Sequence, residues 1–522
     1  MTEEVHVKCR KRADWRLAVA AMLLMPLGAA QAGSGWAFQD KWVDVTEDGR
    51  AHEAVELAHN LLRLDAAIVK MFRMDLGDSR PPVHIYAMPE SQLQKLLGDQ
   101  KIGSEFQIFG YESVVLINTD AAEENRYYGA YDGYSASVLT SEGALRYPFW
   151  FRSGLAEIFS AASMDHKGVK IGDYLPWHAR TLLSGTPLPM RTLLRMHQND
   201  PQVQLGSPVR EMFDSECWFL AHLFIIEGKL RPQFGQYLEL MSRGQAEADA
   251  FAASFPGMSY EDLDKMLRDA LHVGKVQQVV VQVPEEPDSR KPEPLSAAEL
   301  KGRLARIGVL QSKSLDYPLK LAHEALAAEP TNESALRALA LGQLHQKQYA
   351  DSYRTMQALR ARGSLSAPAY ADCAQIGLSV AQAVKQGDAS VGEDAPALMR
   401  QARQDYEQAI ALDQENLGYW SKLVALIGQE QDAEAVRTLR LRVERLFYLH
   451  PRNAELARSL SGMYSQTGDF NNALKFAVAW QGNAMNEESR DAAAAYISRL
   501  KTALERRNAV SGAAEPARSS TD

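Results

Sequence analysis

The stretch Asn453–Asn486, NAELARSLSGMYSQTGDFNNALKFAVAWQGNAMN, holds two apolar helical patterns separated by a Gly-Asp pair. Its small and large residues lie at fixed offsets: Ala457, Leu460, Tyr464, Gly468, Phe470 and Ala473. Small residues let paired helices approach each other, and large residues fill the groove between neighbouring pairs. Because a single pair cannot bury its apolar face, the pattern predicts a stack of helix pairs.

The same pattern occurs twice more in the C-terminal half. Tyr406–Asn416 is followed by Trp420 and Leu423, and Ala325–Pro330 is followed by Leu336, Leu339, Tyr349 and Ser352. With a period of about 34 residues, these segments resemble tetratricopeptide (TPR) repeats. The resemblance implies an all-α TPR solenoid over residues 297–505. Residues 363–400 have an irregular pattern, so one repeat is degenerate or carries an insertion. The residues expected to pack it are Trp420, Leu460, Tyr464, Gly468 and Ala473.

Repeat arrays of this kind usually present a concave surface that binds a partner. The resemblance therefore implies a protein-binding or scaffold role, with a peptide or an envelope protein held by the TPR region. The alternative is a solenoid that only supports the domain before it.

The N-terminal half mixes expected strands, Val83–Ala87 and Val114–Asn118, with helical patterns, and this mixture predicts an α+β domain over residues 37–275. Tyr147–Ser160, YPFWFRSGLAEIFS, resembles the P-x-W-x-x-E-G-x-A-E-x-F helix of gluzincins, the peptidase-MA-like proteins. Three further segments follow in that family's order: Val169–Gly172, Leu188–Leu194 and Glu216–His222. The resemblance implies a zincin-like fold for this domain.

Gluzincins hold zinc with the two histidines of H-E-x-x-H and a glutamate from the next helix, and the glutamate of H-E-x-x-H is the general base. On that frame the two histidines correspond to Asp132 and Ala136, the base to Gly133 and the third ligand to Ser153. No other register restores the motif, because the chain has no histidine between residues 84 and 166. Structural or catalytic zinc needs at least three strong protein ligands. The resemblance thus implies a degenerate domain without catalytic residues, metal or other cofactor.

Three side chains are candidates for lining the vacated cleft: Tyr134, Glu157 and His222. The alternative for Tyr134 is packing on the sheet, and the default for His222, on an apolar helix, is a core histidine. Glu157 corresponds to the second glutamate of the family's helix, which is not its primary ligand. The alternative is an active hydrolase or metallopeptidase with an atypical zinc site, in which Asp132 and Glu157 meet His166 or His178.

The first 32 residues have the three parts of a secretory signal peptide. Basic residues precede the apolar run Leu17–Met25, and Ala30-Gln31-Ala32 follows it. The run is shorter than the ~20 apolar residues of a membrane-spanning helix. We expect an exported protein and, from the style of the leader and the repeat architecture, a periplasmic one. The alternative is a leader that is kept as an anchor.

Two other segments differ in composition from their surroundings. Val283–Leu295 contains four prolines, which predicts a stiff Pro-rich linker over residues 276–296. Residues 506–522 are mostly small or polar and are expected to form a disordered tail.

The overall charge is acidic. Lys and Arg total 57 and Asp and Glu total 66, which gives a net charge of −9. Without residues 1–32, which hold five basic and three acidic residues, the net charge is −11. Nucleic acid is therefore not an expected partner, since that affinity comes mostly from neutralised phosphates. After the leader, no segment is apolar for long enough to span a bilayer.

Overall fold

The computed structural model describes residues 35–39, 43–48, 51–72, 83–98, 104–109, 112–121, 127–141, 147–197, 200–203, 207–273, 276–283, 291–311, 314–414, 416–430, 433–451, 453–484 and 487–513. The leader predicted over residues 1–32 lies outside them. None of the helices in these ranges is both long and apolar enough to cross a bilayer.

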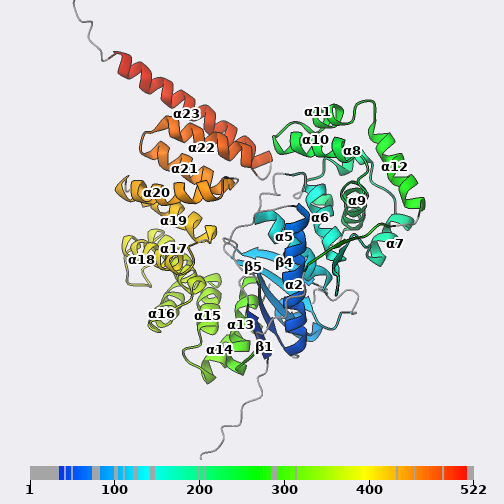
Figure 1. Ribbon diagram of the computed structural model, residues 1–522. Coiled ribbons are helices and arrows are strands. Elements are labelled where there is room, and N and C mark those ends of the chain that lie inside the picture. Colours follow the sequence, from blue (N-terminus) through cyan, green and yellow to red (C-terminus); the bar gives the residue numbers. More distant parts are fainter. Residues whose placement is uncertain are drawn as a thin grey trace, which may run out of the picture.

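The N-terminal half is built on a six-stranded mixed sheet with the order β4-β5-β3-β2-β1-β9 (Figure 1). Its strands are β1 (Gly35–Gln39), β2 (Val43–Glu47), β3 (Val83–Met88), β4 (Ser104–Phe109), β5 (Glu112–Asn118) and β9 (Glu293–Leu295). The central strands β2, β3 and β5 run parallel, and β1, β4 and β9 pair antiparallel to their neighbours.

Alternate side chains of the central strands enter two different cores. Ile85 and Val115 lie in a core with α2 (Ala51–Phe72) and α5 (Tyr128–Ser141), which cover one face of the sheet. Tyr86 and Val114 point to the other face and pack with α3 (Glu90–Leu97) and α13 (Ala297–Gln311). Because α13 is the first helix of the C-terminal half, the sheet and the solenoid share one hydrophobic core.

The rest of the N-terminal half is helical apart from a small second sheet. That sheet has the order β6-β7-β8 and consists of β6 (Ser163–Asp165), β7 (Gly168–Ile171) and β8 (Val279–Val281). The helices are α6 (Phe149–Ser160), α7 (Pro176–Ser184), α8 (Met190–Leu193), the 3-10 turn η2 (Pro201–Val203), α9 (Pro208–Ile225), α10 (Arg231–Ser242), α11 (Glu247–Ser254) and α12 (Tyr260–Val273).

A buried glutamate fixes the entry to α8. Both carboxylate oxygens of Glu216 on α9 accept the backbone N–H of Leu188 at 3.2 Å. Burial, with Asp264 nearby, raises the pKa of Glu216 to about 8, although the hydrogen bond from Leu188 acts in the opposite direction. The neutral carboxylic acid is therefore the form that the fold prefers.

This preference predicts a pH-dependent stability. A raised folded-state pKa gives a contribution that is fully present below about pH 4.5 and is lost as the pH rises to about 8. Between these limits the free energy of unfolding should fall by on the order of 3 kcal/mol because of Glu216. Urea unfolding from pH 5 to pH 9 measures the slope, and Glu216→Gln should flatten it. An equally steep slope in that variant would assign the effect to other groups.

The C-terminal half is a continuous series of antiparallel helix pairs (Figure 1). The first helices of the pairs are α13, α15 (Glu333–His345), α17 (Ala367–Lys385), α19 (Leu417–Glu430) and α21 (Ala454–Gln466). Their partners are α14 (Asp316–Ala328), α16 (Tyr349–Arg360), α18 (Ala395–Leu412), α20 (Ala433–Leu449) and α22 (Phe470–Asn483), and α23 (Glu487–Ala513) packs on α22.

The five residues expected to pack the repeats lie on the repeat helices or in the turns between them. Trp420, Leu460 and Ala473 are buried, and Tyr464 stacks on Phe476 with ring centroids 5.4 Å apart. Gly468 has φ = 77° in the turn between α21 and α22, a conformation that glycine adopts without strain.

Three sequence-based expectations need correction. Residues 276–296 do not form only a linker, since β8 and β9 lie in this range and extend both sheets. Pro294 is tolerated because β9 is an edge strand. Residues 363–400 are not irregular: they hold α17, the start of α18 and a longer turn between them. The helix α23 runs to Ala513, so the segment from 506 to 513 is helical rather than disordered.

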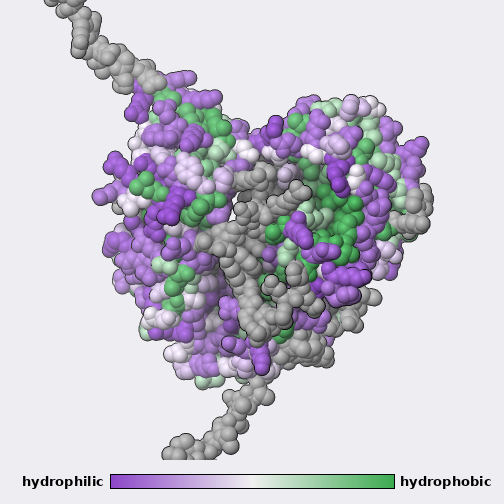
Figure 2. Space-filling view, viewed as in Figure 1, coloured by the Kyte–Doolittle hydropathy of each residue, from purple (hydrophilic) through white to green (hydrophobic). Residues whose placement is uncertain are grey.

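Both ends of the solenoid contact the N-terminal half. At the first end, α13 packs on the sheet. At the other end, the side chain of Arg490 on α23 lies against Gly244, in the turn between α10 and α11. Figure 2 shows the notch that separates the two halves on this side of the molecule. The contact at each end means that the solenoid is attached to the N-terminal half at two places.

Candidate functional site

The positions that the sequence resemblance to gluzincins assigns to a metal site lie on α5 and α6, which pack against each other. Asp132, Gly133 and Ala136 are on α5, and Ser153 is on α6. The hydroxyl of Ser153 donates to Asp214 Oδ1 at 2.9 Å, and Arg210 donates to Asp214 Oδ2 at 2.5 Å. The Ser153 hydroxyl thus joins α6 to α9.

The donor set does not fit a gluzincin zinc ion. Gly133 and Ala136 have no ligating atom, and the Ser153 hydroxyl is engaged with Asp214. Among the described residues, no group of three or more His, Cys, Asp or Glu side chains has a geometry that could hold a metal ion. No hydrolytic step through zinc is therefore derived for this arrangement.

Three carboxylates nevertheless lie close together here. Burial and the neighbouring carboxylates of Glu157 and Asp214 raise the pKa of Asp132 well above its ordinary value. Burial and Glu157 also raise the pKa of Asp214 to about 6, although Arg210 and Ser153 act in the opposite direction. The fold thus favours a neutral acid at Asp132, which is a poor ligand for a metal.

Glu157 and His178 meet, as the atypical metal site requires, but their atoms are engaged with other protein groups. Tyr128 donates to both oxygens of Glu157 at 2.9 Å, and His178 Nε2 lies 3.1 Å from Glu157 Oε2. His178 Nδ1 lies 2.9 Å from Ser215 Oγ, which donates to the carbonyl of Glu211. His166 lies in the turn between β6 and β7.

Glu157, His178 and Ser215 contact one another in that order and have the residue types of a hydrolase triad, but a substrate cannot reach them. Ser215 is 1% exposed and His178 is 1% exposed. The His178 ring also stacks on Trp218 at an interplanar angle of 9°. A nucleophile has to reach a substrate carbonyl, so this buried arrangement serves to join α6, α7 and α9.

The three residues expected to line an open cleft are instead buried. Tyr134 is 1% exposed and packs in the core around α2 and α5. Glu157 is 5% exposed, and His222 is fully buried and donates Nε2–H to the carbonyl of Gln277 at 2.8 Å. His222 is thus a core histidine that ties α9 to the segment before β8.

A second candidate site lies between the sheet and the solenoid. It is a cavity of about 800 Å³ lined by Gln39, Asp44, His84, Tyr86 and Glu112 from the sheet, and by fifteen residues of the solenoid. Most of the solenoid residues lie on or beside the first helices of the pairs, where α13, α15, α17 and α19 begin. Its size is in the range of ligand pockets, roughly 300–1,000 Å³.

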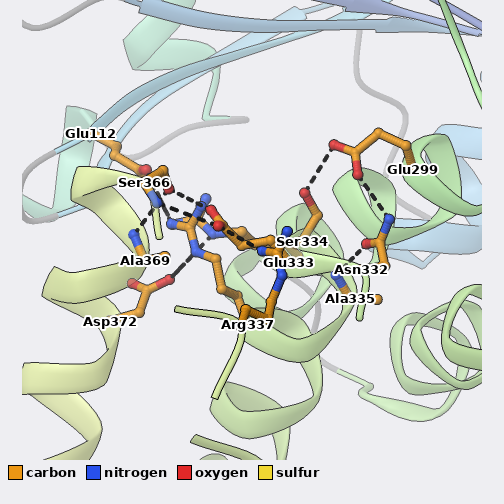
Figure 3. A network of polar contacts seen from close by, with 12 residues as sticks. Glu112, Glu299, Asn332, Glu333, Ser334, Ala335, Arg337, Ser366, Ala369 and Asp372 are labelled. Atoms are coloured by element: carbon orange, nitrogen blue, oxygen red, sulfur yellow. Dashed lines mark hydrogen bonds and ion pairs between the residues drawn. The ribbon is translucent and has the colours of Figure 1, made fainter. Parts of the chain in front are cut away.

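Four charged side chains join the two halves beside this cavity. Glu112 on β5 forms ion pairs with Arg306 on α13 and with Arg337 on α15, the latter at 3.4 Å. Asp372 on α17 pairs with Arg337 at 2.6 Å (Figure 3). Asp372 also pairs with Arg306 at 3.5 Å. All four side chains are less than 10% exposed. We refer to these four residues as the interdomain ion cluster.

The cluster keeps the Glu112 carboxylate charged despite its burial. Burial alone would raise the pKa of Glu112, but Arg306 and Arg337 lower it to about 2. Nearby, Arg303 donates to Glu299 Oε1 at 2.8 Å and to the Thr46 hydroxyl at 2.9 Å. The sheet and α13 are therefore joined by charged groups as well as by the shared hydrophobic core.

Sequence reasoning missed this cavity, although the sequence contains a signal for it. Glu299, Arg303 and Arg306 are spaced by four and three residues, so they lie on one face of α13. Arg337 and Asp372 interrupt apolar repeat helices at positions that the TPR pattern would bury. Charged side chains at such positions are almost never buried without a partner, and this predicts ion pairs without identifying which residues form them.

Comparisons with known proteins find TPR proteins among the solved structures. No family model matches the chain, and no curated protein matches it. A thermophilic TPR protein of Thermus thermophilus matches with 16% identity, 40% of this chain and 99% of that chain covered, and a TM-score of 0.27. Yeast Tom70 matches with 11% identity, 75% and 76% coverage and a TM-score of 0.25. The TPR domain of P58(IPK) matches with 11% identity, 73% and 85% coverage and a TM-score of 0.19.

The helical half of this chain is TPR-like, as its sequence predicts. Helix pairs follow one another, and small residues such as Ala457 and Ala473 are buried between them. The side chains of Asn332 and Asn453 cap the first helices that follow them, α15 and α21. Such a solenoid is typical of protein-interaction scaffolds.

Proposed function

We propose that this protein is an exported scaffold that binds a peptide or another envelope protein through its solenoid. The N-terminal half is then a gluzincin-like domain that no longer hydrolyses peptides with zinc. The observation that carries the second part is the hydrogen bond from Ser153 to Asp214, at the position where the family has its third zinc ligand. Gly133 and Ala136, at two further positions of that site, have no side-chain atom that could bind zinc in place of the missing ligand.

The solenoid supports the first part, with one restriction from the structure. The sheet already covers the inner side of the first helix pairs, so a partner has to bind to the later repeats or to the cavity. Among the later repeats, Lys422 on α19 and Lys475 on α22 are exposed amines. The N-terminal half offers Lys265 on α12 as an exposed amine for comparison.

The experiment for partner binding is amine-reactive crosslinking in intact cells, followed by mass spectrometry. We expect one recurrent envelope protein or peptide to be linked to Lys422 or Lys475 and not to Lys265. A partner that is linked only through Lys265 would show that the N-terminal half is the binding part and would contradict the proposal.

The experiment for the degenerate site is the metal content of the mature protein, purified without a histidine tag and incubated with zinc. The expected result is much less than one zinc per chain, because the four site positions offer one carboxylate at most. One zinc per folded chain, lost in Glu157→Gln, would instead support an atypical site. The meeting of Glu157 and His178 is the observation that favours that alternative.

A further inference from the structure

The residues that line the cavity between the sheet and the solenoid carry more negative than positive charges. Six carboxylates line it: Asp44, Glu112, Glu299, Glu329, Glu333 and Asp413. Four arginines line it as well: Arg303, Arg306, Arg337 and Arg362. Counting these carboxylates and arginines alone, the wall carries a formal charge of −2, from six acidic and four basic residues.

Each arginine of the wall is already paired with a carboxylate. Arg306 and Arg337 belong to the interdomain ion cluster, and Arg303 pairs with Glu299. Arg362 pairs with Glu333 at 2.7 Å, and Ser366 donates to the same carboxylate at 2.5 Å. The cationic groups of the cavity are therefore not available to hold an anionic ligand.

Two carboxylates of the wall are different. Among the described residues, Glu329 accepts hydrogen bonds from two neutral donors, the Ser296 hydroxyl at 2.7 Å and Asn332 Nδ2 at 3.2 Å, and from no charged one. Asp413 has no ion pair with any of the residues that the structure describes. The two occupy equivalent places after α14 and α18, where the repeats read ALAAE and AIALD. Both are half-buried, so water screens their charges less than it would on an open surface.

We propose that this cavity binds an organic cation with primary ammonium or guanidinium groups, held by Glu329 and Asp413. Such a cation brings the donors and the positive charge that the wall lacks. The volume of about 800 Å³ accommodates an extended amine or the end of a short basic peptide, and it is far larger than a metal ion requires. Neutral lining groups such as Thr331 and Asn416 provide polar contacts for the rest of the ligand.

The site goes beyond the proposed scaffold function, since a cation can bind here whether or not the later repeats hold a protein. Two kinds of ligand carry such a cationic group, a free polyamine and a peptide with a basic side chain. Calorimetric titration of the full mature chain with spermidine and with the tripeptides Gly-Lys-Gly and Gly-Arg-Gly separates them, with both peptides and the citrulline analogue N-acetylated and C-amidated so that the side chain is their only cationic group. The citrulline analogue of the arginine peptide and inorganic phosphate test the requirement for positive charge.

The variants Glu329→Gln and Asp413→Asn remove the two carboxylates with little change in volume. Each should weaken cation binding by about tenfold, because a hydrogen bond to a charged group is lost. The controls Glu324→Gln and Asp388→Asn remove the same charge outside the cavity, and neither should change the affinity by more than about twofold. Thermal unfolding of the four variants checks that they stay folded.

Three results would overturn the proposal. One is the absence of detectable binding by all three cations at a ligand concentration of about 10 mM, because a dissociation constant above that value is too weak to be functional. Another is equal binding of the citrulline peptide or preferential binding of phosphate. A third is an equal loss of affinity in the variants and their controls. Crosslinking through Lys422 or Lys475 is scored independently, so failure here leaves the scaffold function to its own test.

Discussion

Replacing Glu112 with Gln is expected to lower the free energy of unfolding by about 3–5 kcal/mol, the cost of removing one partner from a buried ion pair. Glu112 is 5% exposed and is the only member of the interdomain ion cluster that the sheet provides. Without its charge, Asp372 is the one carboxylate left within the cluster to pair with the two buried cations, Arg306 and Arg337.

The effect should also be visible in the cooperativity of unfolding. The sheet and α13 share a core, so the wild-type chain should unfold these parts together. In Glu112→Gln, urea unfolding followed by tryptophan fluorescence should separate into two transitions, since Trp150 and Trp420 report on different halves.

The matched control for Glu112 is an exposed ion pair. Arg354 and Asp351 on α16 lie 2.9 Å apart, with the Arg354 side chain 77% exposed. Arg354→Gln should change stability by less than about 1 kcal/mol. If Glu112→Gln cost no more than this control, the ion cluster would not hold the two halves together.

Replacing Gly154 with Ala is expected to destabilise the N-terminal half by more than about 3 kcal/mol. Gly154 lies on α6 where this helix crosses α9. An added Cβ atom would lie 2.2 Å from the carbonyl oxygen of Cys217 and 2.8 Å from the Cβ of Ala221. A backbone carbonyl in a helix cannot move aside as a flexible side chain does, so the two helices would have to separate.

Gly235 on α10 provides the opposite case. No atom lies within 4 Å of a Cβ built at this position. Gly235→Ala should therefore stabilise the chain by roughly 0.5–1 kcal/mol, through helix propensity alone. Thermal unfolding of both variants measures the contrast. A mild effect of Gly154→Ala would show that the crossing of α6 and α9 is looser than the structure describes.

The absence of a zinc motif could be established from the sequence alone. The contacts that the remaining residues of the site make could not. The lack of any histidine between residues 84 and 166 excludes H-E-x-x-H in that segment. The engagement of Glu157 with Tyr128 and His178 depends on α6, α7 and the start of α5 meeting in space. Tyr128 and His178 lie 29 and 21 residues from Glu157 in the sequence, and no local pattern specifies the paths of the loops between them.

His222 illustrates the same limit within one helix. Its apolar neighbours on α9 predict burial, and burial alone does not distinguish a cleft residue from a core residue. The deciding contact is the carbonyl of Gln277, 55 residues away, in a segment that the prolines had suggested was only a linker.

The sequence by itself determined the helix pairs, the α+β character of the first half and two of its central strands, β3 and β5, because hydrophobic periodicity reports local structure directly. Only the tertiary structure decided that the solenoid packs its first helices on the sheet and encloses a polar cavity there. The physical reason is that Arg306, Arg337, Glu112 and Asp372 are each costly to bury alone and are stable only together. Such compensation joins residues up to 260 positions apart, and no periodicity within one element can show it.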